Sequence, residues 1–121
     1  MPVFVKFETP KDLSDKAYTL AEVARDTGKI KKGTNEVTKI VERGEAVMII
    51  MAVDVNPPEI LAHMPALCQE RNVPFVYVPN KTELGKAIGL EKPTASVAII
   101  DAGKGKALVD EIVKAVNALK N

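Results

Sequence analysis

The spacing of apolar residues along the chain predicts helices alternating with strands. Apolar positions recur every three or four residues, the period of one helix face, in five segments. The expected helices cover residues 11–26, 33–43, 58–71, 82–88 and 107–119, and a short extended piece is expected near Ile30. Continuous apolar runs at residues 46–53, 75–78 and 95–101 predict strands covered on both faces. This alternation predicts an α/β fold, a three-layer α/β/α sandwich on a small mixed sheet.

Residues with special backbone roles mark the expected ends of these helices. Thr9-Pro10-Lys11-Asp12 is similar to a capping box with proline at the first helical position, and Gly28 is the expected stop. Thr34 is expected to cap the next helix through its hydroxyl, Gly44 to end it, and Pro65 to interrupt the helix over 58–71. The residues expected on buried helix faces are Leu13, Ala17, Leu20, Ala21, Ala24, Val37, Ile40, Val41, Ile60, Met64, Leu67, Cys68, Leu108, Ile112, Val113, Val116 and Leu119.

Composition places the chain among folded globular proteins. It has 121 residues, 46% hydrophobic and 27% charged, with no repeat or linker, so one domain over residues 1–121 is expected. No apolar run approaches the length of a membrane-spanning helix, and the start, MPVFVKFETP, lacks the apolar region of a secretion signal. Cys68 is the single cysteine, which fits a reducing compartment. We therefore expect a cytoplasmic protein that is a monomer when free.

Positive charge is concentrated in one short segment. The whole chain is nearly balanced, with 17 Lys and Arg against 16 Asp and Glu, but Lys29–Lys39 holds four lysines and one glutamate. A local basic patch on a balanced protein favours a confined anionic partner over general adhesion to polyanions.

The same segment places three polar side chains on one helix face. At about 100° per residue, Asn35, Glu36 and Lys39 fall within one face, beside the free backbone N–H groups of a helix start. An amide and a carboxylate can address base edges while ammonium groups address phosphates. The alternative is ordinary helix capping with surface lysines, and composition alone favours that alternative.

Catalytic and metal-binding patterns are weak. The chain has no phosphate-binding Gly-x-x-x-x-Gly-Lys-Ser/Thr motif, and His63 lacks the partners of a metal site or a triad. Asp54 and Asp101 both follow apolar strands, where α/β proteins often bind ligands, so a small magnesium- or nucleotide-using enzyme is a second hypothesis. A protein-interaction module using the helix over 58–71 is a third. No catalytic residue, metal ligand or cofactor is predicted.

Longer stretches resemble one known family. The segments that carry the resemblance are KIKKGTNEVTKIVERG and DVNPPEILAHMPALCQERNVPFVYVPNKTELGKAIGLEKPTASVAIID. They closely resemble the archaeal members of the large-subunit ribosomal L7Ae family, which binds kink-turn RNA. The similarity extends from about Val3 to Lys120. Its Gly-Thr-Asn-Glu-x-Thr-Lys, Pro-x-Glu-Ile and Leu-Gly-x-Ala-x-Gly motifs occur in the family's order.

The resemblance implies a set of RNA-contacting residues. A kink-turn is a bulged loop beside tandem sheared G·A pairs, whose exposed guanine edges Asn35, Glu36 and Lys39 would read. Around an extruded bulge nucleotide the resemblance implies Ile60, Lys81, Leu90, Glu91, Lys92 and Pro93, with Ala95 behind them. Gly33 and Thr34 would allow close approach, and Lys32, Lys81 and Lys86 would neutralise phosphates. Without the resemblance, the segment 90–93 is a plausible connector with no role.

The resemblance also implies partners and departures. The implied RNAs are 23S ribosomal RNA, box C/D and H/ACA guide RNAs and ribonuclease P RNA. In box C/D particles a scaffold protein and a methyltransferase would join, and no membrane is implied. Lys92 stands where archaeal relatives often have valine, Ala52-Val53-Asp54 is closer to eukaryotic box C/D relatives, and Asn56 replaces a common acid. These differences bear on the breadth of RNA recognition.

Overall fold

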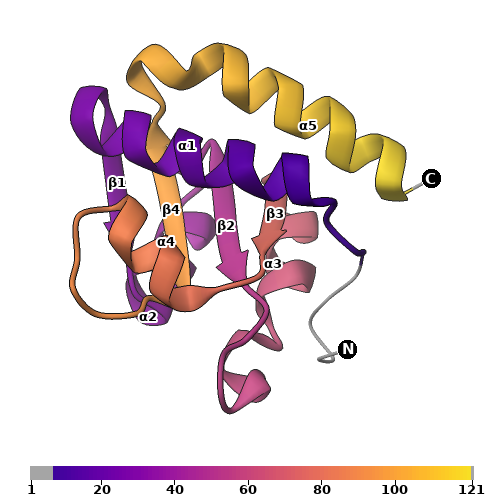
Figure 1. Ribbon diagram of the computed structural model, residues 1–121. Coiled ribbons are helices and arrows are strands. Elements are labelled where there is room, and N and C mark those ends of the chain that lie inside the picture. The colour runs from indigo at the N-terminus through magenta and orange to yellow at the C-terminus, as the bar shows by residue number, and fades with distance from the viewer. Residues whose placement is uncertain (1–6, 121) are drawn as a thin grey trace.

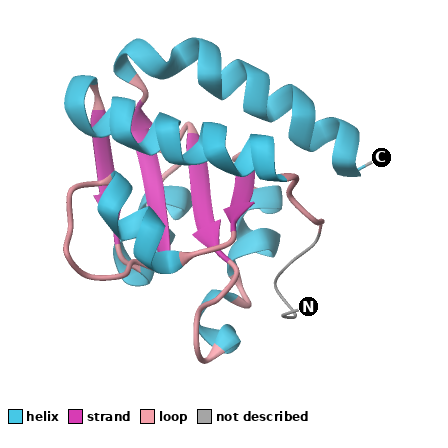
Figure 2. Ribbon diagram, in the orientation of Figure 1, coloured by secondary structure: helices cyan, strands magenta, loops and turns pink. Residues whose placement is uncertain are grey.

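The computed structural model describes residues 7–120. Residues 1–6 and Asn121 lie outside this range, and residues 1–6 include most of the start of the chain for which no secretion signal is expected. Helices and strands alternate as expected (Figures 1 and 2). In chain order the elements are α1 (Lys11–Thr27), β1 (Lys29–Lys32), α2 (Thr34–Glu42), β2 (Met48–Ala52), the short 3₁₀ helix η1 (Pro58–Leu61), α3 (Met64–Glu70), β3 (Phe75–Val78), α4 (Lys81–Ala87), β4 (Ser96–Asp101), the 3₁₀ turn η2 (Gly103–Gly105) and α5 (Lys106–Lys120).

The strands form one mixed sheet in the order β1-β4-β2-β3. β2 and β3 are parallel, whereas β4 runs antiparallel to both β1 and β2. Helices α1, α4 and α5 lie on one face of the sheet, and α2 and α3 lie on the other (Figure 1). The predicted three-layer α/β/α sandwich on a small mixed sheet is confirmed.

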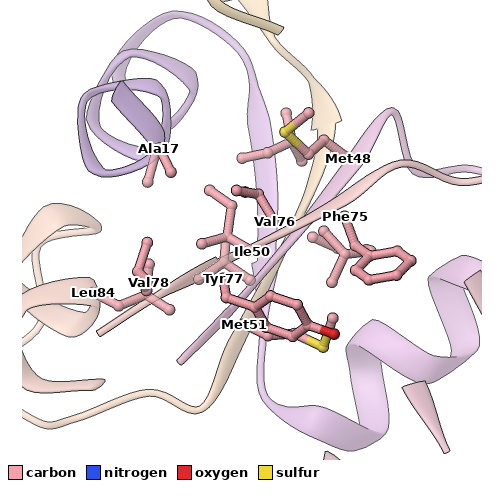
Figure 3. Close-up of a cluster of buried hydrophobic side chains, with 14 of the residues drawn as sticks. Ala17, Met48, Ile50, Met51, Phe75, Val76, Tyr77, Val78 and Leu84 are labelled. Carbon is pink, nitrogen blue, oxygen red and sulfur yellow. The ribbon is translucent and has the colours of Figure 1, made fainter. Parts of the chain in front are cut away.

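The central strands are buried throughout because helices cover both faces of the sheet. Every residue of β2 and β3 is buried, as their uninterrupted apolar runs predict. Ala17 of α1 and Leu84 of α4 approach these strands in the core (Figure 3). Phe7 packs against Tyr77, with ring centroids 4.9 Å apart. Within the described residues, no helix combines the length and apolarity that crossing a bilayer would require.

Two helix starts differ from the expected capping. In α1 the N-cap position is Pro10, and the buried Thr9 hydroxyl makes no hydrogen bond within residues 7–120. In α2 the N-cap is Gly33, and Thr34 is already the first helical residue. A capping side chain must belong to the residue before the first helical one, so neither predicted threonine cap forms.

Two helix ends follow the predicted glycine stops: Gly28 is the C-cap of α1, and Gly44 follows the C-cap of α2. At the end of α2, Gly44 N–H donates to Val41 C=O at 3.0 Å and Glu45 N–H donates to Ile40 C=O at 3.1 Å. This pair of bonds is a Schellman motif, and Gly44 takes the positive φ of 69° that the motif requires. The sequence therefore predicted the ends of helices more accurately than their hydrogen-bonded starts.

Two of the residues expected in buried faces are exposed. Pro65 does interrupt the helix over 58–71, because proline lacks an N–H and its ring would clash with the carbonyl four residues earlier. The break turns Leu61 inward, whereas Ile60 is 39% exposed. Leu119 is also 39% exposed, because the last turns of α5 extend beyond the sheet (Figure 1).

Candidate nucleic-acid interface

A groove of about 510 Å³ lies between the end of β1 and the loop that joins α4 to β4. Its lining residues are Lys32, Gly33, Gly89, Leu90, Glu91, Lys92, Pro93, Thr94 and Ala95. The two sides meet through the Gly33 N–H, which donates to the Ser96 carbonyl at 3.3 Å. The loop runs along the same edge of the molecule as β1 (Figure 1). Folding thus brings together two segments that are far apart in the sequence.

The start of α2 is shaped by Gly33. This glycine has φ 89° and ψ 137°, a conformation that side chains strongly disfavour. Space is not the reason for the glycine, because nothing lies within 4 Å of where a Cβ would stand. The open Gly33 surface, next to the unpaired N–H groups of the first turn of α2, can accept the close approach of an anion.

Asn35, Glu36 and Lys39 are exposed on the helix that starts there, while Val37, Ile40 and Val41 face the core. Burial of the apolar stripe therefore fixes the rotation of the helix and leaves the polar face open. Within the described chain, the ion pairs are Lys16–Glu111, Arg25–Asp26 and Lys86–Glu83. Glu36 and Lys39 are therefore not committed to any of these pairs.

A hydrogen bond between two helices holds α2 in place. Thr38 Oγ1 donates to the Thr34 carbonyl at 2.7 Å and lies 2.9 Å from His63 Nε2. A hydroxyl has one hydrogen, so the geometry assigns the donor role in the second bond to His63 Nε2–H. His63 is thus a structural residue that ties the start of α3 to α2, which agrees with its lack of metal-site or triad partners in the sequence.

Glycine residues also shape the opposite side of the groove. Gly89 N–H donates to Lys86 C=O at 3.0 Å and Leu90 N–H donates to Gly85 C=O at 2.9 Å, a second Schellman motif. A Cβ on Gly85 would collide with the carbonyl oxygen of Lys92. The predicted Leu-Gly-x-Ala-x-Gly motif therefore has a physical cause: it lets the loop fold back closely onto α4.

Four hydrogen bonds hold α4, its preceding residue Asn80 and its loop in place. Lys81 N–H donates to Asp54 Oδ1 at 2.8 Å, and Thr94 N–H donates to Lys81 C=O at 3.1 Å. The Tyr18 hydroxyl donates to Asn80 C=O at 3.2 Å and accepts from Asn80 N–H at 3.1 Å. The sequence does not indicate that Tyr18 is a positioning residue, because its partner Asn80 is 62 residues away. It does not indicate the role of Gly85 either, because the contact with Lys92 depends on how the loop folds back.

The predicted residues fall into three groups. Lys32, Gly33, Leu90, Glu91, Lys92 and Ala95 line the groove. Thr34, Asn35, Glu36 and Lys39 continue from it along α2. Ile60 and Lys81 are not lining residues: Ile60 lies on η1, and Lys81 contacts the loop through its backbone. Lys86 is 3.8 Å from Glu83 in an exposed pair, a weak interaction in water.

The two acids of the enzyme hypothesis lie far apart in the fold. β2 and β4 are antiparallel, with Met48 opposite Ile99 and Met51 opposite Ser96, so Asp54 and Asp101 lie at opposite ends of the sheet. Asp101 Oδ1 instead accepts from Gly103 N–H at 2.9 Å, a turn-capping bond. The two acids cannot share a metal ion, and residues 7–120 contain no group of three or more His, Cys, Asp or Glu side chains placed to hold one.

These features define a class of protein: a small α/β/α sandwich with an exposed groove, bordered by lysines, between a helix start and a glycine-shaped loop. Residues 15–109 match the ribosomal protein L7Ae/L30e/S12e/Gadd45 family. The structure is similar to that of the Giardia lamblia 15.5kD RNA binding protein, with a TM-score of 0.86, 36% identity and 98% of each chain covered. The chain belongs to the ribosomal protein L7Ae/L30e/S12e/Gadd45 family, and the resemblance inferred from its motifs is confirmed.

Proposed function

We propose that this protein binds RNA without catalysing a reaction, and that it recognises kink-turns in large-subunit ribosomal RNA and in box C/D and H/ACA guide RNAs, with ribonuclease P RNA as a further target. The observation that supports this most directly is the continuity between the polar face of α2 and the groove. Family membership and the likeness to an RNA binding protein support the general activity.

The polar face of α2 supplies base recognition. A regular A-form helix has a major groove too narrow for side chains, so sequence-dependent contacts need an irregular RNA site. Sheared G·A pairs present such a site. Asn35 can donate and accept, and Glu36 can only accept, so the exposed pair matches guanine N–H and carbonyl groups. A carboxylate beside phosphates is repelled unless it accepts hydrogen bonds, which makes Glu36 the selective element.

The groove supplies a place for an extruded nucleotide. Its volume of about 510 Å³ is within the range of roughly 300–1,000 Å³ that is common for small-molecule sites. Leu90 and Ala95 offer apolar contact to a base, and Lys32 and Lys92 flank it with positive charge. Ile60 on η1 and Lys81 on α4 do not line the groove, so we assign them RNA contacts outside it.

Binding of this kind shifts the RNA population toward its bent conformation. A protein that contacts only the bent RNA favours it over the extended form by the difference in binding free energy. The protein then serves as a nucleus for ribonucleoprotein assembly in the cytoplasm. In box C/D particles its remaining surface is available to a scaffold protein and, through it, to a methyltransferase.

The test is a fluorescence titration with kink-turn RNA labelled at both arms, so that energy transfer reports bending. The control RNA replaces the sheared G·A pairs by Watson–Crick pairs. We expect tight binding and bending of the first RNA alone. Equal, salt-sensitive binding to both RNAs would refute kink-turn recognition and reduce the lysines to general electrostatics.

A further inference from the structure

Arg25, near the end of α1, lies against the groove from a third side. Gly89 has φ 82° and lines the groove, and a Cβ built on it would stand 3.0 Å from Arg25 Nη1 and 3.5 Å from Arg25 Cδ. The arginine side chain therefore covers the bare face of this glycine. The C-terminal end of α1 and the loop after α4 both lie on the β1 side of the molecule (Figure 1).

The Arg25 guanidinium makes one hydrogen bond to a neighbouring carboxylate and keeps further donor groups. Its Nε–H donates to Asp26 Oδ1 at 2.8 Å. Because this bond uses the Nε edge, the two Nη groups keep hydrogens that can donate to another acceptor. The side chain is 38% exposed, so a ligand in the groove can reach it.

We propose that Arg25 binds a backbone phosphate next to the nucleotide held in the groove, which extends the RNA footprint from β1 and α2 onto α1. This inference rests on the proposed function, and it concerns a residue that the motifs do not include. With Lys32 on β1 and Lys92 in the loop, cations from three separate elements surround the groove.

Arginine suits this position for a physical reason. Its planar fork can donate two parallel hydrogen bonds to one phosphate, whereas a lysine acts as a point charge. The hydrogen bond to Asp26 favours one plane of the guanidinium before RNA arrives, which reduces the conformational entropy lost on binding. Gly89 lacks the side chain that would separate the fork from the groove.

The experiment combines a protein variant with modified RNAs. Arg25→Gln is titrated against kink-turn RNAs that each carry one neutral methylphosphonate linkage, placed in turn at every position around the bulge. Arg71→Gln is the matched control, because Arg71 is an exposed arginine at the end of α3, on the other face of the sheet. Arg25→Lys keeps the positive charge and removes the paired hydrogen-bond donors of the guanidinium, so it separates the two contributions to binding.

We expect Arg25→Gln to weaken binding about tenfold and to lower the log–log salt slope by roughly 0.7–0.9. At one or two positions, replacing the phosphate by a neutral linkage should lower the affinity of the wild-type protein. The same replacement should not lower the affinity of Arg25→Gln any further. A merely structural role of Arg25 would give no such linkage-specific cancellation. Arg25→Lys should keep most of the salt slope and lose part of the affinity.

Failure of this proposal is distinguishable from failure of the proposed function. If wild type discriminates kink-turn from control RNA, but Arg25→Gln responds to every linkage as wild type does, the role of Arg25 is refuted and kink-turn recognition stands. If wild type does not discriminate, the proposed function itself fails. Should Arg25→Gln be poorly folded by circular dichroism, Arg25→Ala replaces it in the linkage scan: responses that match wild type at every linkage refute the phosphate contact.

Discussion

The backbone N–H of Gly33 donates a hydrogen bond to the carbonyl of Ser96 at 3.3 Å. This bond joins the residue before α2 to the first residue of β4, so the start of the polar helix and the end of the loop Gly89–Ala95 are attached to each other. The two sides of the groove are therefore held together by the fold itself, without a ligand.

Gly33→Ala should lower both stability and RNA affinity. With φ 89° and open space around the absent Cβ, the cost is backbone strain of about 1–3 kcal/mol and not a collision. Relief of that strain would move the start of α2. Thermal unfolding and the kink-turn titration measure the two effects.

Gly44→Ala is the matched control, because Gly44 also has a positive φ, 69°, and also has nothing within 4 Å of a Cβ. We expect a comparable loss of stability with unchanged RNA affinity, since Gly44 lies at the far end of α2. Equal losses of affinity in the two variants would show that only overall stability is being measured.

Gly85→Ala should displace the loop on the other side of the groove. The added methyl group would collide with the Lys92 carbonyl, so either α4 or the loop must shift. Overpacking of this kind costs about 1–3 kcal/mol, and here the shift falls on residues that line the groove. We expect lower thermal stability together with weaker kink-turn binding, measured well below the melting temperature of the variant.

Gly28→Ala provides the comparison, because a Cβ on Gly28 would collide with the Asp101 carbonyl at the other end of β4. Its stability loss should be similar, and its RNA affinity at low temperature should match wild type. Unchanged binding in Gly85→Ala would mean that the exact position of the loop does not matter for recognition.

The sequence predicted the layers of this fold because the apolar patterns are strong. β2 and β3 are fully buried runs, and the faces of α1 and α2 hold the expected residues. The apolar pattern of a helix gave wrong predictions of burial where no other element packs against that face of the helix. Leu119 has the helical period of a core residue, yet α5 extends past the sheet there and the side chain stays exposed.

The candidate site was predictable in its parts but not in its assembly. The polar face of α2 follows from helical geometry, since Val37 and Ile40 must face the core. The contact of Gly85 with Lys92 and that of Gly89 with Arg25 depend on loop conformation, which local sequence does not specify. Asp54 and Asp101 looked equivalent as residues after strands, and only the antiparallel register of β2 and β4 separates them.

Tyr18→Phe should lower stability in a pH-dependent way. The hydroxyl makes two hydrogen bonds with the backbone of Asn80, so its loss should cost about 1 kcal/mol near neutral pH. Burial raises the pKa of Tyr18 above its ordinary value of 10.0, with nearby Glu83, Asp54 and Asp15 adding to the rise against the opposing backbone bond from Asn80.

A raised pKa in the folded state means that folding favours the neutral phenol. Its contribution is therefore complete below pH 10.0 and declines as the pH rises from there through the folded pKa. Urea unfolding of wild type and Tyr18→Phe between pH 7 and 11 measures this. The difference in unfolding free energy should shrink above about pH 10, and a constant difference would contradict the assignment.

Glu36→Gln separates base recognition from electrostatics by the sign of its effect. Glu36 is exposed on the first turn of α2, so the variant should fold normally. If Glu36 were only a surface charge, its removal would reduce repulsion from phosphates and strengthen RNA binding. If it accepts hydrogen bonds from guanine, the amide loses a charge-assisted contact, and kink-turn affinity should fall by about 2 kcal/mol. Glu42→Gln removes an equal charge at the last residue of the same helix, at the end far from the groove, and should leave affinity unchanged or slightly higher. Opposite shifts of the two variants in a parallel titration would support guanine recognition, and a gain of affinity in Glu36→Gln would refute it.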